Sequence, residues 1–519
     1  MKHINISHVL LLSIGLGLST SSCNDFLDKL PDNRTELDTE QKITKLLISA
    51  YPDISANELF ELYSDNTDDN GPKYSYYQLA EEDCYNWRDT QEEYQDTPNY
   101  LWEGYYKAIA AANTVLKAIE QQGNPQSLNP QRGEALICRA YSHFMLANIF
   151  CNAYNSHAAE ELGIPYMEEV ETTVNPQYKR GTLKEVYEKI ERDLLASMPL
   201  ISDDSYSVPK YHFTRKAAYA FATRFYLNYM QTDFSNCDKV IDYATRVLGN
   251  DANGQLRDWE AWGKLTANDN VQPDAYIAST NRANLLINST MSNWGILISN
   301  YMAGKRYMHN KLIASYETSQ SAGLWGNSDY LYVKPFTTSG YECSFIRKSG
   351  VYEGSNYLYY MPIVFNTDEI LLYRAEAYAL KKNYTQAATD ITTWQKAYSK
   401  NKNTLTPEMI HAYYGGMPYY SPLTSLTPKK KLHPDFTVEE GIQESMIQCI
   451  LHIRRITSLH EGLRWPDIKR YGIVIYRRLV SDGYGNITDE MPVNDLRRAI
   501  QIPKSVILAG MEPNPRTNE

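Results

Sequence analysis

The sequence has few cysteines, no long apolar run in its body and none of the common catalytic motifs. Seven of its 519 residues are cysteine, and no two of them form a Cys-x-x-Cys pair, which excludes a zinc ribbon and a thioredoxin-like redox motif. No segment has 18 consecutive apolar residues, so we expect no transmembrane helix. Gly-x-Ser-x-Gly, His-Glu-x-x-His, P-loop and Gly-x-Gly-x-x-Gly motifs are also absent. These absences weigh against the familiar hydrolase and nucleotide-binding classes.

Charge and aromatic content narrow the classes further. The net charge of −11 argues against nucleic acid as a ligand, because phosphate binding needs a basic face. A mean hydropathy of −0.50 is typical of a globular chain rather than of a membrane bundle. Tyrosine is in excess, with 43 Tyr against 12 Phe and 8 Trp. Since Phe packs as well without a hydroxyl to satisfy, this preference predicts many half-exposed rings, which suit interfaces and amphipathic ligands.

Residues 1–22 are predicted to be a signal peptide that is removed. Lys2 supplies the positive start, and the apolar run Val9 to Leu18 is too short to span a bilayer. Small residues then lead directly to Cys23, an arrangement that resembles a bacterial lipoprotein signal, in which the cysteine thiol is acylated. We therefore predict Cys23 as the lipidation site, with an ordinary signal peptide and an incidental cysteine as the alternative.

The body of the chain is predicted to be mostly helical. Apolar residues recur with helical spacing in several segments, and Thr182 with Glu185 forms a capping-box signature. Residues 222–244 and 374–391 have the small and aromatic positions of tetratricopeptide-like helical pairs. Residues 60–100, 250–365 and 401–436 lack this periodicity and are predicted to be loops. The predicted helices cover residues 105–121, 134–154, 183–200, 214–230, 237–248, 368–380, 384–398 and 441–459.

Five stretches, in order along the chain, resemble the SusD/RagB family of nutrient-binding outer-membrane lipoproteins of Bacteroidota. Two departures occur near the last stretch: Ile453 and Thr457 replace acidic residues, and His460 stands where an apolar aromatic residue is common. These changes affect packing and ion pairing. The five stretches are Cys23–Asp28, Trp102 to Asn113, Arg132 to Tyr141, Arg374–Tyr378 and Glu461–Gly472.

The resemblance implies one mostly α-helical, globular SusD-like fold over residues 23–519, with tetratricopeptide-like pairs and an irregular, loop-rich ligand-binding face. Within it we expect an N-terminal helical part (23–250), a loop-rich ligand-face insertion (251–365) and a C-terminal helical part (366–519). The resemblance also implies an outward-facing lipid anchor in the outer membrane and a SusC-like TonB-dependent transporter as partner. The cargo of the family is usually a glycan and sometimes a peptide.

Sugar binding needs flat apolar surfaces for CH faces and polar groups for hydroxyls. Tyrosines on helix faces, such as Tyr105, Tyr141, Tyr226 and Tyr378, are better explained as packing. Gly323 and Gly326 flank Trp325, which favours an exposed loop tip. Tyr413, Tyr414, Tyr419 and Tyr420 form a second platform, a transporter contact or a packed loop. The predicted ligand-binding residues are Tyr85, Trp87, Arg88, Trp294, Trp325, Asn327 and Tyr330.

Two charged segments receive structural interpretations. Residues 65–71 have oxygen ligands at alternate positions, as a calcium loop needs, but Tyr77 stands where the closing Glu belongs, so we favour a solvated acidic loop. Glu461, Arg464, Asp467, Lys469 and Arg470 are expected to pair with one another. No metal and no cofactor are predicted.

The sequence thus favours a non-catalytic glycan-binding protein. Its alternatives are a RagB-like peptide-binding subunit of an importer, a surface glycoside hydrolase and a purely structural helical-repeat adaptor. Carboxylates are abundant enough that a glycosidase pair is not excluded by counting.

Overall fold

A computed structural model describes residues 37–516, except 173–177, 267–269, 299–303, 338–339, 351, 354–357 and 481–485. The predicted signal peptide and Cys23 lie outside the described residues. Among the described residues, no helix has the length and apolar character needed to cross a membrane.

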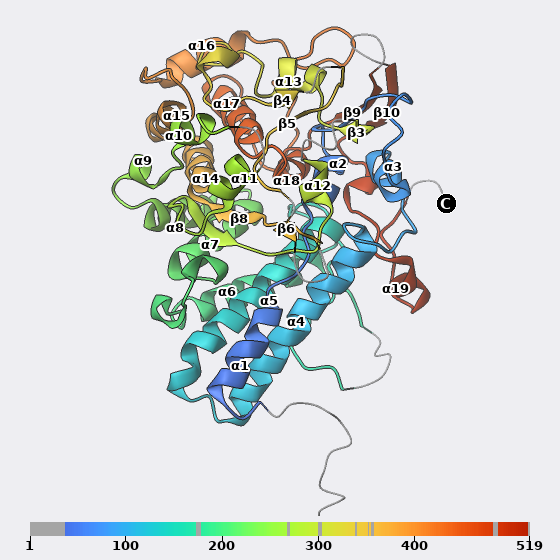
Figure 1. The fold of residues 1–519 in the computed structure, drawn as a ribbon, viewed down its shortest axis with the longest axis vertical. Helices are drawn as coiled ribbons and strands as arrows, with labels where there is room; N and C mark the ends of the chain where they lie inside the picture. Colours follow the sequence, from blue (N-terminus) through green and yellow to red (C-terminus); the bar gives the residue numbers. More distant parts are fainter. Residues whose placement is uncertain are drawn as a thin grey trace, which may run out of the picture.

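Long helices pack as antiparallel neighbours in the lower and left parts of the molecule (Figure 1). Helix α5 contacts α4 and α6, α7 contacts α8, and α14 contacts α15, α8 and α17. The predicted mostly helical fold with tetratricopeptide-like pairs is therefore confirmed. The frame consists of α4 (Pro98–Gln121), α5 (Asn129–Phe150), α6 (Leu183–Ser197), α7 (Arg215–Asn228), α8 (Ser235–Leu248), α14 (Thr367–Leu380), α15 (Tyr384–Tyr398) and α17 (Ile442–Thr457).

Local sequence explains where the helices begin. Thr182 caps α6 by accepting from the backbone N–H of Glu185, whose side chain accepts from the Thr182 N–H in return, so the predicted capping box is confirmed. At the start of α4, Thr97 caps the helix, and Pro98 fills the first position, where no N–H is needed. The tyrosines predicted to pack between helices are buried or half-buried, with Tyr105 and Tyr226 almost fully enclosed.

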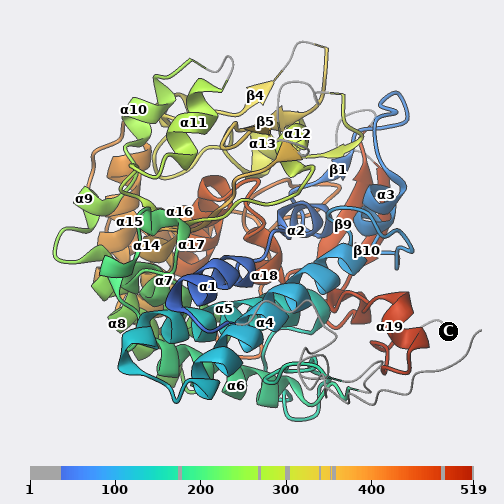
Figure 2. The ribbon, with the colours of Figure 1, turned by 60° about the horizontal axis from the view of Figure 1, so that its bottom comes forward.

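Short elements cover the upper side of this frame, along the edge that Figure 2 shows above α4 and α6. They include α2 (Asn57–Tyr63), α3 (Leu79–Tyr85), α10 (Trp259–Gly263), α11 (Val271–Ile277), α12 (Trp294–Leu297) and α13 (Lys311–Glu317). Strands β2 (Asn284–Ile287), inside the insertion, and β8 (Ile363–Asn366), at its C-terminal end, pair antiparallel. This pairing joins the insertion to the frame directly before α14.

A small sheet brings distant segments together. Its order is β10 (Asn486–Met491), β9 (Ile475–Leu479), β1 (Asp68–Asp69) and β3 (Tyr307–Met308). Asp69 pairs with Tyr307 in antiparallel register and with Leu479 in parallel register. A separate hairpin, β4 (Phe336–Thr337) with β5 (Ser344–Phe345), lies in the insertion.

The loop predictions are wrong where short helices form, at α3 within residues 60–100, at α10 to α13 within residues 250–365, and in the first part of residues 401–436. Residues Pro407–Gly416 form α16, which Thr406 caps and which packs against α17. Tyr414 is buried there, with its hydroxyl 2.9 Å from His452 Nδ1. Tyr420 lies beneath Lys430, with Nζ 3.2 Å from the ring centroid. Tyr414 and Tyr420 are thus packed, whereas Tyr419 is 36% exposed, so a packed segment describes only part of this group.

Residues of the family-like stretches meet as buried ion clusters. Arg139 donates to both carboxylate oxygens of Asp193, at 2.7 and 2.9 Å, and to Asn113. Glu376 accepts from Arg454 at 2.6 Å and from Arg470 at 2.5 Å. These contacts tie α4, α5 and α6 together on one side, and α14, α17 and α18 (Arg464–Arg470) on the other.

The expectation that the 461–470 charges pair mainly with one another is wrong. Asp467 accepts two hydrogen bonds from Arg454 of α17, and Arg464 donates two to Asp65 of the N-terminal region. Lys469 donates to the backbone carbonyl of Cys151 at 2.9 Å. One pair within the group remains, Arg470 with Asp467 at 3.4 Å. The charged residues of 461–470 therefore bond to several distant segments of the chain, and they do not stabilise only their own helical turn.

The acidic run 65–71 is also not a solvated loop. Asn66, Asp68 and Asn70 are buried, and Asp68 accepts from the guanidinium of Arg478 at 3.1 and 2.8 Å. Arginine side chains donate hydrogen bonds to side-chain oxygens that a calcium ion would need as ligands. Among the described residues, no group of His, Cys, Asp and Glu has the arrangement of a metal site. The six cysteines of the described chain are buried free thiols.

Candidate functional site

Tyr85 and Trp87, two of the predicted ligand-binding residues, are buried. Tyr85 stacks on Tyr307 at 4.8 Å, and its other neighbour is the Arg477 guanidinium at 4.3 Å. Trp87 donates from Nε1 to the Tyr63 carbonyl at 3.1 Å and lies 4.0 Å from the same guanidinium. Their exposed fractions are 1% and 2%. The structure contradicts an exposed position for both rings, because protein atoms already cover their faces.

Trp294 and Trp325 are buried as well. Trp294 donates to the His460 carbonyl at 2.8 Å. Trp325 packs against Trp394 and His452, with ring centroids 5.7 and 5.3 Å away. The predicted exposed loop tip at Trp325 is wrong: Gly323 and Gly326 pair with each other across the indole, and a side chain at Gly323 would lie 2.3 Å from the ring. These glycines allow close packing over a buried tryptophan.

Arg88, Asn327 and Tyr330 are exposed; Asn327 and Tyr330 belong to one turn, in which the Tyr330 N–H donates to the Asn327 carbonyl at 3.1 Å. Arg88 donates to Asp83 at 2.9 Å and lines a hollow shared with residues 500–503. Asn327 accepts from the Asp329 N–H at 2.9 Å, and Tyr330 is 46% exposed. The backbone carbonyl of Tyr330 accepts from the Lys400 N–H at 2.7 Å, beside a second hollow that also includes Lys400. Their role in ligand binding stays a prediction.

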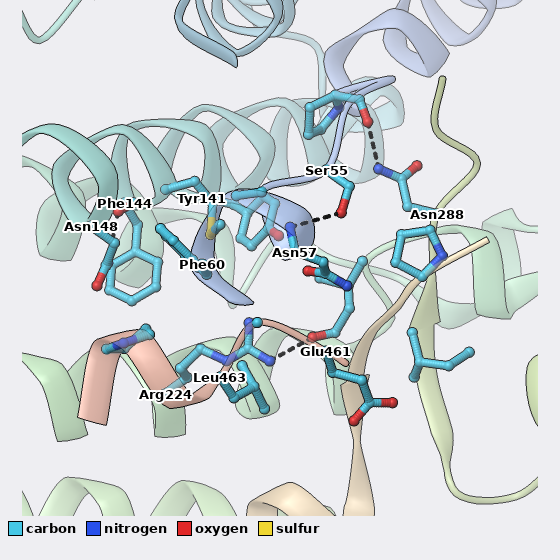
Figure 3. Close-up of a pocket in the computed structure, with 18 of the residues that line it drawn as sticks. Ser55, Asn57, Phe60, Tyr141, Phe144, Asn148, Arg224, Asn288, Glu461 and Leu463 are labelled. Carbon is cyan, nitrogen blue, oxygen red and sulfur yellow. Dashed lines mark hydrogen bonds between the residues drawn. The ribbon is translucent and has the colours of Figure 1, made fainter. Parts of the chain in front are cut away.

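One enclosed cavity lies where the helical frame meets the 461–463 turn. Figure 3 shows side chains from α2, α5 and α7 converging there, among them Phe60, Tyr141 and Arg224. The cavity has a volume of about 60 Å³, which is room for a few water molecules, whereas ligand sites usually need several hundred Å³. Arg224 is committed to Glu369 through bonds of 2.6 and 2.7 Å. This cavity is a packing gap between the helical frame and the 461–463 turn.

A cluster of tyrosines lies at the surface where residues 74–77 meet β3 and the loop between β4 and β5. We call Tyr74, Tyr76, Tyr77, Tyr307 and Tyr341 the tyrosine cluster. The Tyr74 and Tyr341 rings are 6.4 Å apart, and Tyr77 meets Tyr307 edge-on at 5.4 Å. Tyr76 pairs with Lys305 through a β-bridge. The Tyr341 ring lies beside the adjacent Gly304, where a Cβ atom would be 3.3 Å from the ring.

The cluster has a buried base and two open rings. Tyr74 and Tyr307 are almost fully enclosed, and the Tyr74 hydroxyl accepts from the Glu342 N–H at 3.1 Å. Tyr76 and Tyr341 are 50% and 40% exposed. An arrangement with fixed inner rings and exposed outer rings provides flat apolar surface at little cost in side-chain entropy.

Charged groups of both signs surround these rings. The Arg306 guanidinium lies 5.2 Å from the Tyr77 centroid and 5.1 Å from that of Tyr307. Two hydrogen bonds of 2.9 Å to Asp69 fix its plane and raise the pKa of Arg306 above its usual value. Lys305 Nζ lies 5.0 Å from the Tyr76 centroid and pairs with buried Glu81. Aromatic faces beside fixed planar donors are the combination that sugar recognition uses.

The sequence indicated the two segments of this cluster but not its members. They belong to two of the three non-periodic regions of the sequence, residues 60–100 and 250–365; the third region, 401–436, is not part of the cluster. The predicted residues do not include Tyr76 or Tyr341. Of those predicted, Tyr85, Trp87, Trp294 and Trp325 are buried, and Arg88, Asn327 and Tyr330 are exposed outside the cluster. A usable signal was present: Tyr76 lies in an alternating Tyr-Ser-Tyr run, and Tyr341 follows Gly340, whose left-handed backbone (φ 83°) marks a turn.

Comparison with known proteins agrees with this fold. Residues 25–227 match a SusD-like family model described as starch-binding and associating with the outer membrane. A SusD superfamily protein from Bacteroides vulgatus has 18% sequence identity and a TM-score of 0.64, over 94% of this chain and 100% of that one. No curated protein matches the chain.

Other solved structures give the same result. A SusD superfamily protein from Bacteroides thetaiotaomicron has 17% identity and a TM-score of 0.60, over 91% of this chain and 98% of that one. A SusD-like carbohydrate-binding protein from Bacteroides vulgatus has 14% identity and a TM-score of 0.62, over 90% and 96%. The resemblance to the SusD family is therefore confirmed, by sequence over residues 25–227 and by fold over nearly the whole chain.

Proposed function

We propose that this chain is a cell-surface glycan-binding lipoprotein that captures oligosaccharides and delivers them to a SusC-like TonB-dependent transporter. The observation that carries the proposal is the tyrosine cluster, whose two exposed rings come from the two segments that the sequence indicated. The family description, starch-binding and associating with the outer membrane, supports the same ligand class and location. Lipidation at Cys23 would hold the protein at the membrane.

Binding in this proposal breaks no bond. Sugar CH faces stack on Tyr76 and Tyr341, and the sugar hydroxyl groups exchange hydrogen bonds with the partly exposed Arg306–Asp69 pair. Each stacking contact is modest, at about 0.5–1.5 kcal/mol. Affinity should therefore be weak for short oligomers and should increase with chain length until both rings are engaged.

Isothermal titration with neutral malto-oligosaccharides of increasing length tests the proposal. Tyr76→Ala and Tyr341→Ala should each lower the affinity for the longer oligomers by about two- to tenfold. Tyr211→Ala is the matched control, since it removes a ring of similar exposure (40%) from the helical part of the chain. Binding that is unchanged in both cluster variants would refute the site.

Other results of the same titration favour other functions. Binding of peptides without any binding of glycans would favour the RagB-like peptide importer. Release of sugar products, abolished by a single carboxylate substitution, would instead establish a glycoside hydrolase. Both results would contradict a non-catalytic glycan-binding protein.

A further inference from the structure

A hollow of about 590 Å³ lies along α4 and shares no described residue with the tyrosine cluster or the enclosed cavity. Its volume is within the usual range of ligand sites, and we call it the α4 hollow. One wall is α4, the second is the segment 165–171, and the third is formed by α19 (Lys504–Leu508) and the residues that follow it. Figures 1 and 2 both show α19 next to one end of α4.

The α4 wall is an apolar stripe with an aromatic end. Trp102, Tyr106 and Ile109 follow one another at intervals of four and three residues, which places them on one face of the helix. The Trp102 and Tyr106 rings are 4.9 Å apart. Met167 and Met511 stand on the other two walls, and their flexible thioether side chains adapt to the shape of a ligand. The interior of the hollow is therefore apolar and adaptable.

Polar groups beneath this stripe bond within the protein. The Tyr106 hydroxyl donates to the Pro165 carbonyl at 2.8 Å. The Asn113 amide donates to the carbonyls of Met167 and Glu169, at 3.1 and 3.3 Å. These bonds fix the 165–171 wall against α4, so a ligand in the hollow meets mainly the apolar side of the helix.

Two carboxylates stand at the rim of the α4 hollow. Glu169 and Glu171 are exposed lining residues, and no described lining residue is basic. Within the described part of the chain, neither carboxylate forms an ion pair. Glu171 accepts from the Tyr178 hydroxyl at 2.7 Å, and burial together with this bond raises the pKa of Tyr178 to about 12, so the donor stays neutral. Both negative charges are therefore available to a ligand.

The described basic residues next to the hollow have other positions or partners. Lys117 of α4 pairs with Glu120 at 2.8 Å, and Lys504 lines a separate hollow. Lys179 is exposed outside the lining. Arg180 is buried, and its guanidinium donates to backbone carbonyls. An apolar floor below an acidic rim fits a ligand with an apolar body and a positive charge.

We propose that the α4 hollow binds an organic cation with an apolar body, such as an alkylated amine or a quaternary ammonium compound. The apolar body packs on the α4 stripe and the two methionines. The cationic group faces Glu169 and Glu171, beside the aromatic rings, which also attract cations. This inference does not rest on glycan binding, because the tyrosine cluster uses other residues.

Isothermal titration of the full mature chain with octyltrimethylammonium tests the site, in the unacylated form so that no detergent competes. Octan-1-ol and octanoate are the neutral and anionic comparisons with the same apolar chain, and the cation should bind about fivefold more tightly than either. The double variant Glu169→Gln with Glu171→Gln should lower the affinity for the cation about fivefold. Glu408→Gln with Glu440→Gln is the matched control, since it removes the same charge from exposed positions elsewhere.

A second variant tests the position of the site without removing a buried residue. Ala110→Phe places a ring in the hollow from an exposed position of α4 and should abolish binding, whereas Ala196→Phe, at an exposed position of α6, should leave it unchanged. The proposal is overturned if octan-1-ol or octanoate binds as tightly as the cation, or if Ala110→Phe binds as before.

Two further outcomes would also overturn it. One is an equal loss of affinity in the control double variant and in the rim double variant. The other is a loss of octyltrimethylammonium binding in Tyr76→Ala, which would place the cation at the tyrosine cluster. Binding of malto-oligosaccharides should persist in Ala110→Phe, so that failure of this site and failure of the glycan site are distinguishable.

Discussion

Replacement of Glu376 by glutamine should destabilise the protein strongly although it changes the shape of the side chain very little. Glu376 is fully buried on α14 and accepts from Arg454, Arg470 and the Tyr471 hydroxyl, the last at 2.6 Å. Glutamine keeps the volume but removes the negative charge. Among the described residues of this cluster, Asp467, at 3.4 Å, is then the acidic partner that Arg470 retains.

The magnitude follows from the pKa of Glu376. Burial alone raises this pKa, but the charges of Arg470 and Arg454 outweigh burial and lower it from 4.5 to about 2. A carboxyl group shifted by that amount contributes about 3 kcal/mol to the free energy of unfolding at pH 7. Removal of one partner from a buried ion pair typically costs about 3–5 kcal/mol, which agrees.

The pH dependence has a definite sign. Because the folded-state pKa is lowered, the contribution of Glu376 is complete above about pH 4.5 and is lost as the pH falls toward about 2. The difference in unfolding free energy between the natural protein and Glu376→Gln should therefore be largest at neutral pH. It should shrink steadily in acid.

Urea unfolding followed by circular dichroism at pH 7, 4 and 3 measures this difference. Glu439→Gln is the control, because its pair with Lys382 is about half exposed on both sides and should be worth less than about 1 kcal/mol. A loss below about 1 kcal/mol for Glu376→Gln at pH 7 would refute the reasoning. So would a difference that grows as the pH falls.

Two further predictions concern a glycine and the anchor. Gly323→Ala should lower the unfolding free energy by about 1–3 kcal/mol, because the new methyl group would lie 2.3 Å from the Trp325 ring. Gly416→Ala is the control, because a methyl group there would have no atom within 4 Å. In the same urea assay it should change the unfolding free energy by less than about 0.5 kcal/mol. Equal effects of the two alanines would contradict the close packing at Gly323. Cys23→Ala should release the protein from the outer membrane into the soluble periplasmic fraction, as cell fractionation and immunoblotting would show, and unchanged membrane attachment would rule out lipidation at this cysteine.

Much of the helical frame could be predicted from the sequence because its signals are local. Apolar spacing located the long helices, and the Thr182–Glu185 pair located the start of one of them. The loop prediction failed at Pro407–Gly416, where a capping threonine and a proline at the first position were outweighed by the glycines and prolines around them. That helix is stabilised by its packing on α17, which no local pattern records.

The candidate site was predictable only as a pair of segments. A sequence shows that Tyr, Trp and Arg are concentrated in a non-periodic region, but not which rings a fold will cover. The polar segment around Trp87 and the glycines that flank Trp325 favour exposed rings at both positions. The fold buries them because large rings gain most from leaving water, and the smaller, hydroxyl-bearing Tyr76 and Tyr341 remain at the surface.

The helical class and the family resemblance follow from the sequence alone, since each depends on residues near one another in the chain or on a motif read in order; the segments of the ligand-binding face stay a prediction. Tertiary structure alone decided the partners of the charges. Asp65 and Arg464 are almost 400 positions apart and meet through two hydrogen bonds. Burial makes an unpaired charge costly. The charged residues of 461–470 therefore bond to opposite charges or to backbone carbonyls from distant parts of the chain. Which part supplies each partner depends on the folded structure.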